Sequence, residues 1–188
     1  MKYTINWLKA EIENGFQPEY LFFWGHTAKL AGVIDKSCFS QWWPAPFTVN
    51  GIEYHTAEHW MMAKKALLFN DKENFDLILQ ATKPAIAKNL GRAVRNFDAA
   101  KWESKAFEFV VAGNLHKFSQ HEALSEFLLR TGDKIIVEAS PVNLVWGIGL
   151  SQEDEEVANP FKWKGPNLLG FALMEVRDEL KNKNGTTT

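Results

Sequence analysis

The chain has little cysteine, no long apolar run and no large excess of charge of either sign. Its single cysteine, Cys38, excludes an internal disulfide and a cysteine-rich zinc cluster. No apolar stretch is long enough to span a membrane, and the N-terminal "MKYTINWLKAEIENG" predicts an amphipathic helix rather than a signal peptide. These absences predict a cytoplasmic protein without membrane contact. The formal net charge of −2 argues against a broad basic surface for duplex nucleic acid, but leaves room for a local phosphate pocket.

Aromatic residues are abundant by contrast. They make up 13% of the 188 residues and include eight tryptophans and fourteen phenylalanines. Many of them can simply pack in the core, but tryptophan also lines pockets for flat or sugar-containing ligands. The length suits a single domain with a sizeable core.

The hydrophobic pattern predicts an α+β fold, namely a single helix-rich domain over residues 1–182 with a few short strands, followed by a disordered tail at 183–188. Asn50-Gly51 between strand formers predicts a hairpin, and Thr56 is a natural N-cap for the helix after it. Asp98 is expected to cap the long helix that starts at residue 99. Gly91 is expected to end a helix that begins at Pro84. We expect helices over 2–14, 57–69, 74–81, 84–94, 99–118, 120–130 and 167–181, strands over 19–25 and 134–140, and a long loop between 141 and 167.

The stretch "GIEYHTAEHWMMAKKALLF" (51–69) carries Glu58 and Lys65 on a helix that is apolar on nearly every side. A seven-residue step is close to two helical turns, so the two side chains share one stripe, flanked by Met61 and Met62. A carboxylate in the first turn is also favoured by the helix dipole, and an isolated lysine commonly extends to solvent. The pair therefore indicates either a site or two ordinary surface charges. Burial would lower the pKa of Lys65 and a nearby Glu58 would raise it.

The same stretch contains "HTAEH", the His-x-x-Glu-His order of one class of zinc peptidase. That motif needs both histidines on one helical face. If Thr56 caps the helix, His55 lies on the preceding strand, and no third ligand is evident. A zinc hydrolase is therefore the alternative from another enzyme class.

A second group of candidates lies at the ends of other elements. Glu138 ends a strand in "RTGDKIIVEASPVNLVWGIGL", and the glycines that follow allow the backbone to approach a ligand closely. Asn167 stands at the start of the last helix, where it either caps the helix or binds an anion. Arg92 either contacts a phosphate or is simply exposed, and Trp102 is by default a core residue.

Taken together, these stretches resemble the NADAR family, also called YbiA-like. The matching pieces are "FFWG", "SQWWPAPFTVNGIEYHTAEHWMMAKKA", "LGRAV", "KWES", "KF", "LLRTGDKIIVEASP", "WGIGL" and "GPNLLGFALMEVRDEL", in the order of the family and over nearly residues 20–180. The resemblance implies an N-glycosidase. Its substrate would be an ADP-ribosylated guanine, in nucleoside or DNA, or a ribosylamino-pyrimidine 5′-phosphate of riboflavin synthesis. It implies no metal and no cofactor.

The resemblance also implies site residues. Glu58, Lys65 and position 143 are expected to be catalytic, with Lys65 able to form a Schiff base, a chemistry that relatives are thought to use. The resemblance also places Trp102 and Glu138 in the site. Residue type and position make the other expected substrate contacts Trp24, Gly25, Ser40, Gln41, Trp42, Trp43, Met62, Arg92, Trp146, Gly147 and Asn167. The expected partner is a ribose-phosphate or ADP-ribose ligand, with ADP-ribosylated DNA as an extension. The sequence does not indicate an oligomeric state.

One position departs from the family. Relatives usually carry aspartate where this chain has Asn143. If that aspartate moves protons, asparagine cannot do so. Either Asn143 is a natural variation or the chain is an inactivated variant, and a module that binds ADP-ribose without cleaving it is then the second alternative.

Overall fold

A computed structural model of the chain describes residues 1–185. Short strands and many helices give the expected α+β class. The chain divides into two compact units: unit 1 comprises Met1–Ser40 and Ala123–Thr188, and unit 2 comprises Gln41–Glu122. The assignment of residues 1–182 to one domain stays a prediction.

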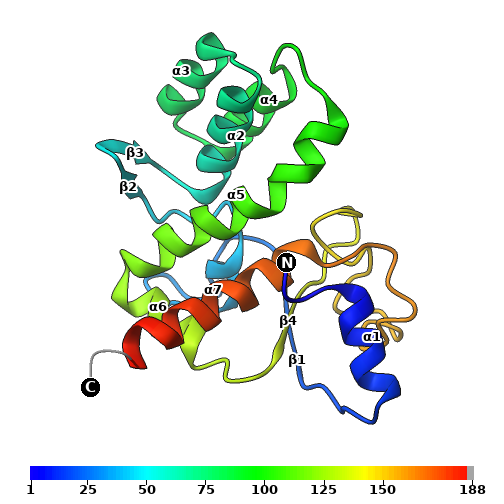
Figure 1. Ribbon diagram of the computed structural model, residues 1–188. Coiled ribbons are helices and arrows are strands. Elements are labelled where there is room, and N and C mark those ends of the chain that lie inside the picture. Colours follow the sequence, from blue (N-terminus) through cyan, green and yellow to red (C-terminus); the bar gives the residue numbers. More distant parts are fainter. Residues whose placement is uncertain (186–188) are drawn as a thin grey trace. The chain divides into compact units, whose positions relative to one another are not determined.

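Unit 1 is built around a parallel pair of strands, β1 (Tyr20–Phe23) and β4 (Ile135–Glu138), with Phe23 opposite Glu138. Ile135, Ile136 and Val137 are buried, as expected for a parallel pair covered on its faces. Helix α7 packs against β4 (Figure 1). The other elements of this unit are α1 (Ile5–Glu13), the 3₁₀ helix η1 (Lys36–Phe39), α6 (Glu122–Leu129, which starts at the boundary) and α7 (Leu168–Gly185).

Close approach of α7 to β4 depends on a glycine. A Cβ at Gly170 would lie 2.0 Å from the carbonyl oxygen of Ile136. Only a residue without a side chain allows this separation, because the neighbour is backbone and cannot rotate away. The sequence "NLLGF" therefore sets how tightly the last helix covers the strand.

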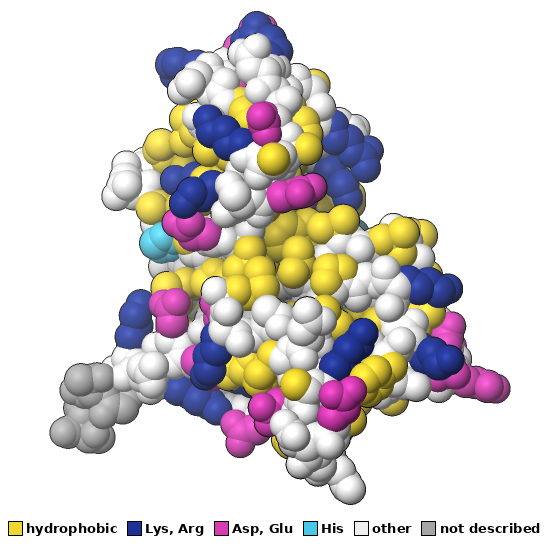
Figure 2. All heavy atoms as spheres, turned by 45° about the vertical axis from the view of Figure 1, so that its right-hand side comes forward, with side chains coloured by type: hydrophobic (Ala, Val, Ile, Leu, Met, Phe, Trp, Pro, Cys, Tyr) yellow, Lys and Arg dark blue, Asp and Glu magenta, His cyan; other side chains and the backbone are white. Residues whose placement is uncertain are grey.

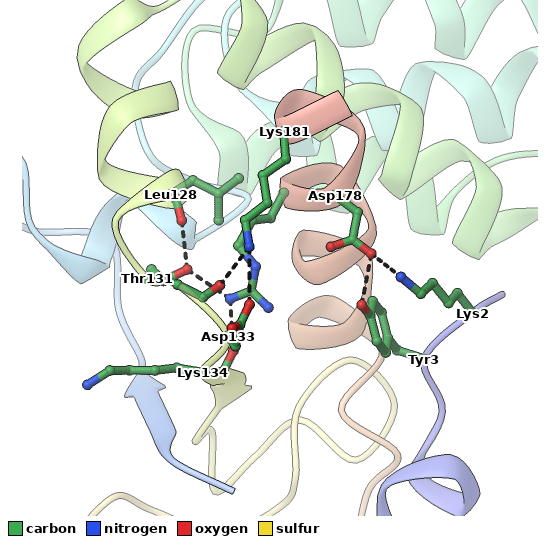
Figure 3. Close-up of polar contacts among 10 residues, drawn as sticks. Lys2, Tyr3, Leu128, Thr131, Asp133, Lys134, Asp178 and Lys181 are labelled. Carbon is green, nitrogen blue, oxygen red and sulfur yellow. Dashed lines mark hydrogen bonds and ion pairs between the residues drawn. The ribbon is translucent and has the colours of Figure 1, made fainter. Parts of the chain in front are cut away.

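The N-terminal segment of unit 1 is tied to the same helix. Figure 3 shows Lys2 and Tyr3 pointing toward Asp178 on α7, where the Tyr3 hydroxyl donates a hydrogen bond of 2.8 Å and the Lys2 ammonium forms an ion pair. Arg177, one residue earlier, is buried and donates to the hydroxyl of Thr131 at 2.9 Å and to the carbonyl of Lys134 at 2.8 Å. Helix α7 is thus held to segments that lie far away in the sequence.

Unit 2 is a helical cluster around α2 (Ala57–Leu68), which contacts three other helices. The residues of α2 from Ala57 to Ala63 are all buried, which explains why its sequence is apolar on nearly every side. Thr56 caps the helix as expected, accepting from the backbone N–H of His59. The neighbouring elements are α3 (Lys72–Gln80), α4 (Pro84–Arg92), α5 (Ala99–Ser119) and the hairpin of β2 (Phe47–Val49) and β3 (Ile52–Tyr54) (Figure 1).

The hairpin turn follows the prediction from the sequence. Asn50 and Gly51 both have positive φ, 50° and 78°, as a type I′ turn requires. Asp98 caps α5 by accepting from the N–H of Lys101 at 2.8 Å, also as expected.

The structure differs from the sequence prediction at Gly91. This residue does not end α4, which continues through Arg92. A Cβ at position 91 would lie 2.0 Å from the sulfur of Met62, so the glycine serves the contact between α4 and α2. Helix α7 extends to Gly185, and residues 186–188 of the expected disordered tail lie outside the described part of the chain. The 3₁₀ helix η1 was not predicted.

On the face drawn in Figure 2, lysine and arginine side chains lie among aspartate and glutamate side chains, with hydrophobic groups between them. This mixed surface agrees with the small net charge of −2. Within residues 1–185, we find no helix that combines the length and the apolar character needed to cross a membrane.

Candidate active site

Glu58 is a buried carboxyl group of unit 2 whose pKa is raised. It stands in the first turn of α2, is 7% exposed, and its backbone N–H donates to the carbonyl of Gln41 at 2.9 Å. Burial raises the pKa of Glu58 from 4.5 to about 6, although nearby Lys88, the indole of Trp42 and Arg92 act in the opposite direction. A carboxyl group of this kind can hold and release a proton near neutral pH.

The cations that act on Glu58 come from α4. Lys88 and Arg92 are four residues apart and therefore share one stripe of that helix. The Lys88 ammonium lies 5.6 Å from the centre of the Trp42 ring, and the Trp42 side chain hydrogen-bonds to Glu58. The structure thus brings the predicted residues Trp42, Glu58 and Arg92 together and adds Lys88, which sequence reasoning missed. The spacing of Lys88 and Arg92 on a helix without acidic residues was the available signal.

Gln41 supports this group from the preceding loop. Its side-chain carbonyl accepts from the amide of Asn114 at 2.8 Å, while its own amide nitrogen is buried without a hydrogen-bond partner. An unpaired buried donor is costly, and such atoms are candidates for ligand contacts. Trp43 is half-buried, and Met62 is buried against Gly91.

Lys65 occupies an aromatic setting at the other end of α2. Its ammonium lies 4.2 Å from the centre of the Phe97 ring and 5.6 Å from that of Trp102, which is itself half-buried. Burial lowers the pKa of Lys65. A lowered pKa increases the share of neutral amine, which is the nucleophilic form. Phe97 was not predicted; it follows α4 in a loop and carries no motif.

Glu58 and Lys65 lie on one face of α2 but at different positions along the helix axis. Seven residues at ~1.5 Å per residue separate their Cα atoms by about 10 Å along the helix axis. Of the two opposing effects that the sequence left open for Lys65, burial is the one that shifts its pKa, and the shift is downward. The two groups therefore stand about two helical turns apart on the same face of α2.

A second cluster of predicted residues lies at the end of the strand pair in unit 1. Because β1 and β4 are parallel, their carboxyl ends lie side by side. Trp24 and Gly25, which follow β1, therefore lie at the same end of the strand pair as Glu138, the last residue of β4. The amide of Asn143 donates to a carboxylate oxygen of Glu138 at 3.4 Å. Trp24 is 57% exposed, which is unusual for so large an apolar side chain and suits a ligand-contacting surface.

The loop after β4 is folded back on the strand by its own backbone. The N–H of Ile148 donates to the carbonyl of Glu138 at 3.0 Å, and a Cβ at Gly147 would lie 2.8 Å from that oxygen. Asn143 holds the turn, since its side-chain oxygen accepts from the backbone N–H groups of Val145 and Trp146. Gly147 therefore serves packing within the loop, and Trp146 follows directly from the Asn143 turn. Ser40 ends η1 elsewhere in this unit.

The side chain of Asn167 does not cap the last helix. It accepts from the N–H of Glu138 at 3.0 Å and donates to the carbonyl of Ile136 at 2.9 Å. Its positive φ of 57° places it outside the extended geometry of an N-cap. Asn167 thus fixes the end of β4, and with it Glu138; a direct contact to substrate stays a prediction.

The histidines of "HTAEH" are arranged for packing rather than for zinc. The Nε2 atom of His59 donates to the carbonyl of Ala81 at 2.9 Å, which leaves Nδ1 to accept from the hydroxyl of Thr56 at 2.8 Å. Both ring nitrogens are thus used, and His55 precedes the helix. Within residues 1–185, no group of three or more His, Cys, Asp or Glu residues is positioned to hold a metal ion. The zinc alternative lacks its ligands.

Comparisons with known proteins agree with this architecture. The family model described as the NADAR domain matches residues 22–181. The chain is 46% identical to N-glycosidase R617 of Acanthamoeba polyphaga mimivirus, over 86% of this chain and 96% of that protein. It is 33% identical to the protein irg-1 of Caenorhabditis elegans, over 76% of this chain and 74% of the relative.

A solved structure is also similar. The NMR structure of the Escherichia coli protein YbiA superposes with a TM-score of 0.72 at 27% identity, covering 90% of this chain and 89% of that one. The helix-rich α+β architecture and the matched sequence define a YbiA-like protein. The chain belongs to the NADAR domain family.

Proposed function

We propose that this chain hydrolyses the bond between C1′ of a phosphorylated ribose and a nitrogen of its base, in an ADP-ribosylated guanine or in a ribosylamino-pyrimidine 5′-phosphate. Membership of the NADAR family, with relatives named N-glycosidase, identifies the chain as an enzyme of the N-glycosyl hydrolase class. The choice of these substrates is our proposal. The observation that carries it is Glu58, a buried carboxyl group with a pKa of about 6 beside two cations.

Glu58 supplies the proton chemistry in this proposal. Breaking the C1′–N bond leaves positive charge on the sugar and negative charge on the departing nitrogen. Protonated Glu58 donates its proton to that nitrogen, and the resulting carboxylate then takes a proton from the water that attacks C1′. The products are a ribose with a hydroxyl group at C1 and the free base, so one water is consumed and Glu58 is regenerated.

Lys65 offers a covalent route when the ribose ring opens. Its neutral amine adds to C1 of the ring-opened imine, and the base leaves as an amine, so that a new imine joins Lys65 to C1. Water then hydrolyses this imine to the free sugar. The lowered pKa of Lys65 and its aromatic surroundings of Phe97 and Trp102 support this role. Trp42 and Trp43, in the loop before the hairpin of the same unit, are further candidates for contacts to the sugar and base.

Release of free base tests the proposal directly. The protein is incubated separately with ADP-ribosylated guanosine and with the ribosylamino-pyrimidine 5′-phosphate, and released base is measured by chromatography. We expect release from at least one substrate, a loss of about 10²–10⁴-fold in Glu58→Gln, and normal rates in Glu53→Gln, which changes an exposed glutamate of the hairpin. No release from either substrate, together with tight ADP-ribose binding, would instead identify a binding module.

A further inference from the structure

Lys88 and Arg92 are cations without a carboxylate partner of their own. Some other basic residues of unit 2 do form ion pairs: Arg95 with Asp71 at 2.6 Å and Glu73 at 3.1 Å, and Lys105 with Glu108 at 2.9 Å. Across residues 1–185, neither Lys88 nor Arg92 comes within 4.0 Å of an acidic oxygen. Their charges nevertheless act on Glu58 from this longer range.

The geometry suits one anionic group. Residues four apart on a helix have Cβ atoms about 5–6 Å apart, which allows the two long side chains to converge on a single phosphate group. Lys88 is half-buried and lies against the Trp42 ring, while Arg92 is exposed and can reach outward. Glu58 is not that anion, because it is held by the Trp42 side chain and burial disfavours its charged form.

We propose that Lys88 and Arg92 form a phosphate-binding subsite beside Glu58, and that a phosphate group bound there causes Glu58 to take up a proton. The inference rests on the proposed function and extends it. The positive charges of Lys88 and Arg92 favour the ionised form of Glu58 in the empty site. A bound phosphate cancels that effect, and the proton comes from solvent. The substrate thereby converts Glu58 into the acid that protonates the leaving base.

The groups that face Glu58 come from two segments. They are Lys88 and Arg92 on α4 and Trp42 on the loop before the hairpin. Only the two cations change their effect when an anion binds, since the indole N–H carries no charge. Coupling between phosphate and proton therefore depends on these two residues and on Glu58.

Calorimetry of ADP-ribose binding tests both parts. ADP-ribose is a suitable probe because its diester phosphates lack the second proton of a monoester, which has a pKa of about 6. Titrations at pH ~6.5 in buffers of different ionisation enthalpy give the number of protons taken up per ligand bound. We expect uptake in the wild-type protein, no uptake in Glu58→Gln, and binding of adenosine about tenfold or more weaker, without proton uptake.

The variants test phosphate binding and proton uptake separately. Lys88→Gln with Arg92→Gln should weaken ADP-ribose binding about tenfold or more, whereas Lys83→Gln, at the exposed N-cap position just before the same helix, should leave it unchanged. Unchanged binding of ADP-ribose in the double variant would overturn the subsite. Proton uptake that persists in Glu58→Gln would overturn the coupling. None of these measurements requires turnover, so a negative base-release result would refute the proposed function alone.

Discussion

The pKa values of Glu58 and Lys65 are shifted by burial more than by direct ion pairs. Burial raises the pKa of Glu58 and lowers that of Lys65, although both stand on the same helix. In each case the charged form is disfavoured, because the group has lost water without gaining a close counter-ion. Such groups cost stability, and their presence on one stripe of α2 is the expected signature of a reaction site.

Glu58 should make the protein less stable as the pH rises. Its pKa in the folded chain, about 6, lies above the ordinary 4.5, so the folded state keeps this proton longer than the unfolded state. Stability should fall by about 2 kcal/mol between pH ~4.5 and ~6 and then level off. Urea unfolding of wild type and Glu58→Gln at both ends of this range checks it. A difference between the two proteins that does not change with pH would contradict the pKa assignment.

Lys65 should be needed as an amine and not only as a cation. Lys65→Ala and Lys65→Arg should both abolish base release, because a guanidinium keeps the charge but forms no imine. Lys64→Arg, whose ammonium lies over the Trp60 ring at 4.3 Å, is the matched control and should remain active. Borohydride added during turnover should trap a sugar adduct on Lys65. Substantial activity in Lys65→Arg without a trapped adduct would reduce Lys65 to a binding contact.

The role of Asn143 can be tested by replacing it with aspartate, the residue that relatives usually carry at this position. Asn143→Asp keeps an oxygen for the N–H groups of Val145 and Trp146 but places a carboxyl group beside Glu138. Two adjacent carboxyl groups share a proton, so we expect turnover to rise if this position transfers protons. Asn143→Ala, which also removes the turn contacts, should lower it. Equal rates for Asn and Asp would remove position 143 from the catalytic residues.

At the scale of elements, glycines set how closely helices approach their neighbours. Gly91 lets α4 approach Met62 of α2, and Gly170 lets α7 approach the backbone of β4 at Ile136. These positions decide where Lys88, Arg92 and the end of β4 come to lie. Neither glycine has the positive φ that would make it a turn residue.

The two glycines should respond differently to alanine. At Gly170 the obstacle is a carbonyl oxygen that cannot move aside, so Gly170→Ala should cost about 1–3 kcal/mol or more. At Gly91 the obstacle is the flexible side chain of Met62, and alanine also gains helix propensity of about 1 kcal/mol, so the net loss should be smaller. Denaturant midpoints of the two variants give the comparison. A larger loss at Gly91 would show that Met62 cannot reorient.

At the scale of the whole chain, unit 1 joins segments from both ends of the sequence. The N-terminal Lys2 and Tyr3 contact Asp178 on the last helix. Contacts between such distant segments carry a large loop-closure cost and form only when the strand pair and α7 are assembled. The N-terminal segment is therefore part of this unit.

The Tyr3→Phe variant should measure how much the contact between Tyr3 and Asp178 contributes to stability. Loss of the hydrogen bond to Asp178 should cost about 0.5–1.5 kcal/mol in the free energy of unfolding. Tyr20→Phe is the control, because the hydroxyl of Tyr20 is buried without a partner and its removal should be neutral or stabilising. A loss in Tyr20→Phe equal to that in Tyr3→Phe would show that the effect is not due to the Asp178 contact.

The sequence by itself determined the local structure of this protein. Thr56, Asp98 and Asn50-Gly51 act through their own backbone neighbourhood, so their caps and turn are as predicted. The order of motifs identified the family, which the comparisons confirm. Candidate residues such as Glu58 and Lys65 were visible because helical spacing is a local property, although no finding yet tests their roles.

Only the tertiary structure decided which groups meet. Lys88 affects the pKa of Glu58 because α4 packs against α2 through Gly91. Phe97 contacts Lys65 because the loop after α4 returns to α2. The side chain of Asn167 bonds to β4 instead of capping its own helix, since the approach of α7 brings the strand's backbone groups within reach. The direction of the Lys65 pKa shift followed from burial, which depends on the sum of neighbours brought from distant parts of the chain.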